Sequence, residues 1–151
     1  MEIVEDDLSG ENIALFLEAH MEDMKSVSPP ESKHALDLED LRKVEITFWS
    51  VYNENKLVGC GALKELDALH GEIKSMRTSA CSRGRGIASE LLRHILETAK
   101  SRGYNKVSLE TGSMAFFEPA RNMYLKHGFQ FCTPFGDYKE DPYSVFMSRQ
   151  L

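Results

Sequence analysis

A glycine-containing loop that leads into a long amphipathic segment constrains this chain more than any other stretch. Residues 70–78 have the composition of a strand, Arg83-Gly-Arg-Gly-Ile-Ala88 follows as a loop, and residues 87–102 place apolar side chains at helical spacing. Gly84 and Gly86 let the backbone come close to a bound group. The first turn of a helix adds N–H groups without intrahelical partners and the positive end of its dipole. The junction therefore predicts an anion site, most often for phosphate, with Arg83 and Arg85 beside it.

Apolar periodicity and turn residues along the rest of the chain predict a mixed α/β sheet in one domain over residues 1–151. We expect strands over residues 1–5, 44–52, 57–63, 70–78, 107–111, 129–132 and 143–147, and helices over residues 13–24, 37–43, 87–102 and 113–127. The last helix begins irregularly around Pro119, and Gly59 and Gly61 indicate a bulge or a close backbone approach. The segment from 70 to 111 predicts a parallel β–α–β unit inside a mostly antiparallel sheet, with helices on both faces.

The loop does not match the two commonest nucleotide-binding motifs. No Gly-Lys-Ser/Thr follows it, and Ser89 stands where the dinucleotide motif has its third glycine. Residues 83–88 fit R/Q-x-x-G-x-G/A, and Ala120-Arg-Asn-Met-Tyr-Leu-Lys-His-Gly-Phe129 fits A-x-x-x-Y-x-x-x-G-F. On these motifs, and on the order of elements over residues 44–132, the chain resembles the GNAT superfamily of acyl-CoA-dependent N-acyltransferases. Cys132-x-Pro-Phe-x-x-Tyr138, with Ser28-Pro-Pro30 and His34, is most similar to a small bacterial subgroup, the YsnE-type acetyltransferases.

This resemblance implies a cofactor site and a proton donor. Acetyl-CoA would be the co-substrate, and the backbone that would bind its pantetheine arm and polarise its thioester carbonyl belongs to Met76, Arg77 and Thr78. The residues of the loop that would hold the diphosphate are Arg83, Gly84, Arg85, Gly86, Ile87, Ala88 and Ser89. Tyr124 matches the family's tyrosine that gives a proton to the departing thiolate. Phe117 departs from the family pattern, because many members carry there an Asn that contacts the pantetheine arm.

Acyl transfer to an amine also needs a base or a desolvating site, because an aliphatic amine has an unperturbed pKa of about 10.4. Glu72 is the first candidate, since histone-type members of the family place a catalytic glutamate at the corresponding position. An ordinary surface carboxylate at the end of a strand is the equal alternative for Glu72. Glu110 is its rival as the base, His34 and His70 are weaker candidates, and many family members use a chain of water molecules instead.

Composition argues against several other classes of function. A formal charge of −6 disfavours nucleic-acid binding, and no segment is long and apolar enough to span a membrane or to serve as a signal peptide. The three cysteines have neither metal nor disulfide spacing, so we expect free thiols, a cytoplasmic protein and no metal. An acyl-cysteine route through Cys81 or Cys132 is disfavoured, because no histidine is patterned to activate either thiol.

The sequence leaves functions of different classes open. The first is transfer of an acetyl group from acetyl-CoA to the amine of a small molecule, by direct attack in a ternary complex. The alternative is a CoA-binding regulatory module without turnover, and a nucleotide-binding domain is a third. We expect the acceptor to enter opposite the cofactor, and the candidate walls of its site are Pro29, Pro30, His34, Phe116, Phe117 and Phe135. The sequence does not decide whether the protein forms a homodimer or which acyl chain length it prefers.

Overall fold

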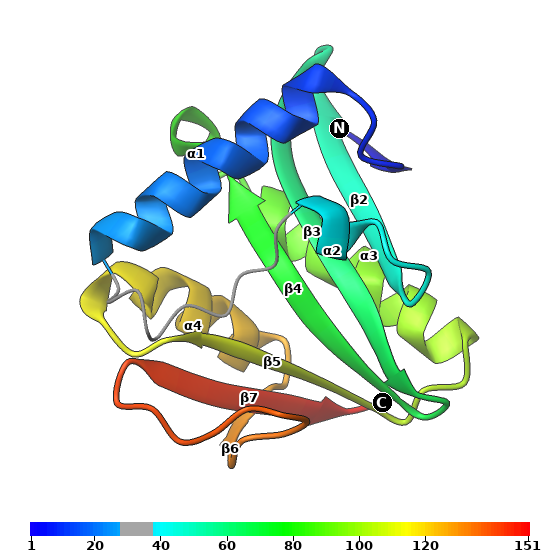
Figure 1. Cartoon of the computed structure of the whole chain (residues 1–151), viewed down its shortest axis with the longest axis vertical. Coiled ribbons are helices and arrows are strands. Elements are labelled where there is room, and N and C mark those ends of the chain that lie inside the picture. Colours follow the sequence, from blue (N-terminus) through cyan, green and yellow to red (C-terminus); the bar gives the residue numbers. More distant parts are fainter. Residues whose placement is uncertain (28–37) are drawn as a thin grey trace.

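Seven strands form a single sheet in the computed structural model, which describes residues 1–27 and 38–151 (Figure 1). The strand order is β1-β2-β3-β4-β5-β7-β6. The strands are β1 (Glu2–Glu5), β2 (Ile46–Asn53), β3 (Lys56–Asp67), β4 (His70–Thr78), β5 (Lys106–Gly112), β6 (Gln130–Cys132) and β7 (Ser144–Gln150). The helices are α1 (Glu11–Val27), α2 (Leu38–Leu41), α3 (Ile87–Ser101) and α4 (Glu118–Lys126), with short 3₁₀ turns η2 (Ala80–Ser82) and η3 (Ala115–Phe117). Neighbouring strands are antiparallel except β4 and β5, so the predicted mixed sheet with one parallel unit is confirmed.

Helices cover both faces of this sheet, as predicted, and in Figure 1 α1 and α2 lie in front of it while α3 lies behind. The larger core lies on the α3 side, because α3 carries its apolar residues at helical spacing and buries six of them against the strands. These residues are Ile87, Leu91, Leu92, Ile95, Leu96 and Ala99. A smaller core on the other face joins Ile13 and Leu17 of α1 to Phe48 and Ala62 of the sheet. The two cores fix the sheet between its helices.

β4 and β5 pair over only part of their length. Their register ends at Ile73↔Leu109, and beyond that point the two strands diverge (Figure 1). The structure shows a bulge in β4 at this point. Ser75 has a φ of 57°, and Ile73 and Met76 both pack on the α3 core although they are three residues apart. The Cys60 thiol donates a hydrogen bond to the Ser75 carbonyl oxygen at 3.3 Å. This bond gives a partner to a backbone acceptor that the bulge takes out of the regular strand pairing.

The glycines of β3 are explained by this bulge. The irregularity lies on β4, not on β3 itself, and Gly61 lies opposite it. A Cβ at Gly61 would overlap the Met76 Sδ and lie 3.0 Å from a Leu91 methyl group. The close approach predicted at Gly61 is therefore real, but it is made by a side chain of β4 and not by another backbone.

Two elements differ most from the sequence-based expectation. β3 continues to Asp67, four residues past its predicted end, because its polar last residues pair with the start of β4 at the half-exposed end of the hairpin. The helix predicted over residues 113–127 is divided into η3 and α4, and Pro119 lies at the first positions of α4, where its missing N–H costs nothing. Pro29, Pro30 and His34 lie outside the described residues.

Candidate active site

A cleft of about 520 Å³ lies beside the free end of β4. Its walls come from that end of β4, the loop into α3, the first turn of α3, η3 and α4, with a contribution from α1. It is lined by all the residues that the sequence assigned to the cofactor except Arg85, which is exposed and lies outside the lining. Tyr124 of α4 lines the same cleft, so the two family motifs meet in one place although they are far apart in the sequence.

The loop from β4 into α3 lines this cleft with residues whose backbone conformation is unusual. Gly84 and Gly86 have φ values of 81° and 78°, a left-handed conformation that glycine adopts without strain. Gly86 is the N-cap of α3, and no side chain caps the helix. Within the described part of the chain, the N–H groups of residues 83–89 donate to no protein acceptor. A helix start with free amides is suited to an anion.

The end of β4 offers a second set of backbone groups. Past Ile73 the strand no longer pairs with β5, while it keeps its pairing with β3 up to Gly59↔Thr78. On the β5 side, the backbone of the last residues of β4 therefore has no strand partner in the parts of the chain described. Met76, Arg77 and Thr78 line the cleft at this position. An extended ligand can take the place of the missing strand there, in the manner of strand addition.

Tyr124 places a phenol in the cleft wall. It is 5% exposed, and its ring packs edge-on against Phe129 with centroids 5.6 Å apart. Burial raises the pKa of the Tyr124 phenol, so the hydroxyl stays protonated at neutral pH. Among residues 1–27 and 38–151 it has no hydrogen-bond partner. Its proton is therefore available to a ligand in the cleft.

Two phenylalanines complete the wall opposite the loop. Phe117 lies directly over Gly112, where a Cβ would overlap its ring, so the glycine lets η3 pack tightly on the end of β5. The Arg83 guanidinium lies 6.0 Å from the centroid of the half-exposed Phe116 ring. Phe116 and Phe117 both line this cleft, together with the residues predicted for the cofactor, so their predicted place on the walls of a separate acceptor site stays a prediction.

The two predicted bases lie elsewhere. Neither Glu72 nor Glu110 lines this cleft, and Glu72 points to the opposite face of the sheet from its neighbour Ile73. Glu72 is 3% exposed, so the alternative that it is a surface carboxylate is wrong. Its Oε2 accepts hydrogen bonds from Lys74 Nζ at 2.9 Å and from Tyr138 Oη at 2.6 Å. Burial, the charge and hydrogen bond of Glu72, and the charge of Glu110 raise the pKa of Tyr138.

Two residues of α1, His20 and Asp23, line the cleft without having been predicted. Arg77 links them to β4: its Nη1 donates to Asp23 Oδ2 at 2.6 Å, and its guanidinium lies 5.4 Å from the centroid of the Phe16 ring. Burial and the charge of Arg77 lower the pKa of His20 to about 4, so the imidazole is neutral at neutral pH. No local pattern could have indicated this contact, because Asp23 and Arg77 are 54 residues apart in the sequence.

The remaining predictions concern cysteines, metals and membranes. Cys81 and Cys132 are exposed free thiols, and neither lines the cleft. Among the residues that the structure describes, no group of three or more His, Cys, Asp or Glu side chains is arranged to hold a metal ion. No helix in the described ranges has the length and apolar character needed to cross a membrane.

The sequence is similar to that of proteins from one known family. The family model described as Acetyltransferase (GNAT) family matches residues 13–129. The chain belongs to the GNAT family. It is 58% identical over 151 residues to the uncharacterised N-acetyltransferase YsnE of Bacillus subtilis (strain 168), with 100% of both chains covered. It is 49% identical over 146 residues to the uncharacterised N-acetyltransferase YedL of Escherichia coli (strain K12), which covers 97% of this chain and 92% of YedL.

A solved GNAT structure has the same fold. The GNAT family acetyltransferase from Elizabethkingia anophelis with acetyl-CoA bound superposes with a TM-score of 0.69 and 19% identity, covering 99% of this chain and 97% of that chain. At this identity the likeness shows the fold alone. The family match and the two relatives confirm the resemblance to GNAT enzymes and to the YsnE-type subgroup, and the chain is an acyltransferase of that family.

Proposed function

We propose that this GNAT protein transfers an acetyl group from acetyl-CoA to the amine of a small molecule, by direct attack in a ternary complex. The observation that carries the proposal is a single cleft that joins three features. These are the free amides at the start of α3, the unpaired backbone of β4 and the buried hydroxyl of Tyr124. Each feature matches one part of an acyl-CoA: its diphosphate, its pantetheine arm and its sulfur.

The cofactor would lie along these features in order. The diphosphate would accept hydrogen bonds from the amides of residues 84–89, with Arg83 beside it. The pantetheine arm would run along Met76, Arg77 and Thr78 in place of a strand, and a backbone N–H there would polarise the thioester carbonyl. Backbone donors aimed at a developing oxyanion contribute about 3–4 kcal/mol each to catalysis. The separation of β4 and β5 is thus what makes room for the reacting group.

The reaction would proceed by addition of the amine and elimination of the thiolate, without a covalent acyl-enzyme. The neutral amine nitrogen attacks the thioester carbon, the C–N bond forms, and the C–S bond breaks as the tetrahedral intermediate collapses. The proton of the amine passes to a base, Glu72 or Glu110, or to water. Tyr124 gives its phenolic proton to the departing thiolate and later recovers one from solvent. Because neither Cys81 nor Cys132 lines the cleft, direct attack is favoured over an acyl-cysteine intermediate.

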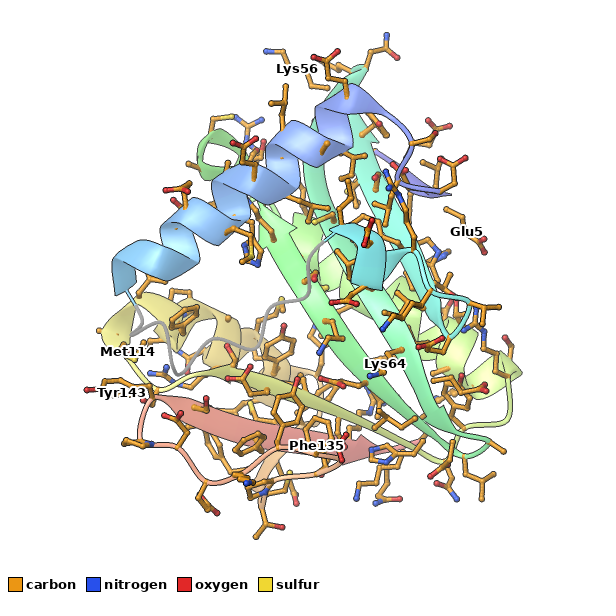
Figure 2. The ribbon with its side chains drawn as sticks, in the orientation of Figure 1. Glu5, Lys56, Lys64, Met114, Phe135 and Tyr143 are labelled. Carbon is orange, nitrogen blue, oxygen red and sulfur yellow. The ribbon has the colours of Figure 1, made fainter. Side chains whose placement is uncertain are left out.

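The acceptor would approach from the face that carries Glu72. Figure 2 shows Phe135 on the side of the sheet that faces the viewer, which is also the side of α1 and α2. Its ring lies 5.1 Å from that of Tyr138 and 6.0 Å from that of Phe146. An aromatic wall of this kind suits a small organic amine.

The second candidate function is a CoA-binding regulatory module without turnover. It would need the loop and β4 but not Tyr124. The retention of a buried phenol in the cleft, with its proton directed to no other described residue, favours an enzyme. The two candidates share the same cofactor site, so only turnover separates them.

Thermal-shift measurements with CoA, acetyl-CoA and longer acyl-CoAs test the cofactor, and free-thiol release over a panel of small amines tests the reaction. We expect saturable stabilisation by CoA, since a ligand at 100 times its Kd adds about 2.7 kcal/mol to the free energy of unfolding. We also expect thiol release that depends on one class of amine. Stabilisation without thiol release would favour the regulatory module, whereas no stabilisation at millimolar CoA would contradict both.

Replacing Gly86 with alanine is expected to weaken CoA binding about tenfold. The left-handed φ of Gly86 costs an L-residue about 1–2 kcal/mol. The added Cβ has no protein atom within 4 Å, so it would project into the open space beside the loop amides. Gly103→Ala is a matched control, because Gly103 has a φ of 87° and equally open surroundings at the other end of α3. Calorimetric titration should show lower CoA affinity in Gly86→Ala alone. Equal affinities in the two variants would remove the loop from the cofactor site.

A further inference from the structure

A buried triangle of hydrogen bonds lies on the sheet face opposite the α3 core. Glu72 Oε2 accepts from Lys74 Nζ at 2.9 Å and from Tyr138 Oη at 2.6 Å, and Lys74 Nζ also donates to Tyr138 Oη at 3.0 Å. The side chains of Glu72 and Lys74 are only 4% and 8% exposed. No contact proposed for the cofactor, and no role given to Tyr124, requires this arrangement.

The two carboxylate oxygens of Glu72 differ in the hydrogen bonds that they accept. Both donors bind Oε2, whereas Oε1 receives no hydrogen bond from any described residue. Among the described residues, the fully buried polar side-chain atoms without a hydrogen-bond partner are Arg77 Nε and Ser144 Oγ. Oε1 of Glu72 is not one of these atoms. One oxygen is therefore fixed by two donors, and no residue in the described ranges donates to the other.

The triangle also lies where the sheet opens. Ile73 is the last residue of β4 that pairs with β5, Glu72 precedes it, and Lys74 follows it. Under the proposed function, the thioester carbonyl is held by the free end of β4, so the triangle lies on the strand that would hold the reacting group, next to the point where its pairing with β5 ends.

Tyr138 is held in place by its own surroundings. Its ring packs against Phe135 and Phe146 with centroids 5.1 Å and 5.5 Å apart, and its N–H donates to the Phe135 carbonyl oxygen at 3.1 Å. Burial and the charge of Glu72 raise the pKa of the Tyr138 phenol, so it remains a neutral donor at neutral pH. The loop between β6 and β7 thus delivers a fixed hydroxyl to a residue 66 positions away in the sequence.

We propose that Tyr138 and Lys74 are positioning residues that hold Glu72 so that its Oε1 takes the proton of the acceptor amine. This inference rests on the proposed function. In the step, the amine N–H bond breaks and an O–H bond forms at Oε1, while the nitrogen bonds to the acyl carbon. The sulfur leaves with the proton of Tyr124, and Glu72 then releases its proton to solvent. Tyr138 and Lys74 exchange no proton and act through Glu72.

A double-mutant cycle on Glu72→Gln and Tyr138→Phe tests the proposal. The readout is free-thiol release from acetyl-CoA with the most active amine of the panel, or with water as the acceptor if no amine accelerates it. We expect Tyr138→Phe alone to lower kcat about tenfold to hundredfold, as misplacement of a reacting group does, with the KM for acetyl-CoA unchanged. In the Glu72→Gln background the same change should lower kcat no further.

Three further variants distinguish a positioning role from a purely structural one. Lys74→Arg keeps a cationic donor and should retain more kcat than Lys74→Met. Tyr143→Phe is the matched control, since Tyr143 is a 43% exposed phenol of the same loop and should keep full kcat. A kcat within twofold of wild type in Tyr138→Phe would overturn the proposal. So would equal losses from Tyr138→Phe in the wild-type and Glu72→Gln backgrounds, because an additive loss indicates a structural anchor for the loop.

The proposed function and this inference fail in different ways. If CoA does not stabilise the wild-type protein, the cofactor site itself is wrong. If CoA stabilises wild type and Tyr138→Phe alike and both turn over equally, only the role of Tyr138 and Lys74 is wrong.

Discussion

The variant Tyr124→Phe is expected to lose about 10²–10⁴-fold in kcat, the range in which general acids contribute to catalysis. The phenylalanine ring keeps the packing on Phe129 and the apolar wall of the cleft but has no proton to give to the thiolate. Affinity for CoA should therefore stay within about twofold. Because burial raises the pKa of Tyr124 above its ordinary value of about 10, the wild-type enzyme should show no loss of kcat from Tyr124 below about pH 10.

Tyr104→Phe is the control for this change. Tyr104 is a second buried tyrosine, 4% exposed, and its hydroxyl donates to Glu65 Oε1 at 2.8 Å, outside the cleft. Its loss should cost about 1 kcal/mol of stability and leave kcat unchanged. Thiol-release kinetics with thermal unfolding of both variants gives the comparison. Full turnover in Tyr124→Phe would show that Tyr124 is not the general acid, and that water protonates the thiolate instead.

Glu72→Gln is expected to lower kcat by about 10²–10⁴-fold as well, because glutamine can keep the hydrogen bonds from Lys74 and Tyr138 but takes up no proton. The variant should also lose about 2–4 kcal/mol of stability, since the Lys74 ammonium, 8% exposed, is left without its counter-charge. Glu110→Gln is the matched comparison on the neighbouring strand. A pH–rate profile decides between them, since the acidic limb of the wild-type profile should disappear in the variant that has lost the base. An acidic limb that is unchanged in Glu72→Gln would show that Glu72 is not the general base.

The loop and α3 could be predicted because their signals are local. Glycines at two positions, a polar loop and an apolar stripe of period 3.6 together specify a helix start with free amides, whatever the rest of the chain does. Tyr124 was predicted from a different signal, its place in a family motif that ends in Gly128 and Phe129. The structure then brings these local signals together in one cleft.

The environment of the two carboxylates could not be predicted from the sequence, because it depends on distant segments. Glu72 and Lys74 alternate with Ile73 along a strand, a pattern equally typical of a solvent-facing edge. The β6–β7 loop folds onto this face and brings Tyr138 against them. The bulge at Ser75 is similar, since its one trace in the sequence is Gly61 on the partner strand. Contacts between segments more than 50 residues apart leave no such local pattern, as Arg77 and Asp23 also show.

Calorimetric titration of the wild-type protein with CoA and with pantetheine, which has the same thiol-bearing arm but no diphosphate, tests the central claim most directly. If main-chain amides at the start of α3 bind the diphosphate, CoA should bind saturably and pantetheine about a hundredfold more weakly, since charge-assisted hydrogen bonds contribute about 1.5–3 kcal/mol each. Equal affinities for the two ligands, or no heat of binding with CoA at millimolar concentration, would contradict it.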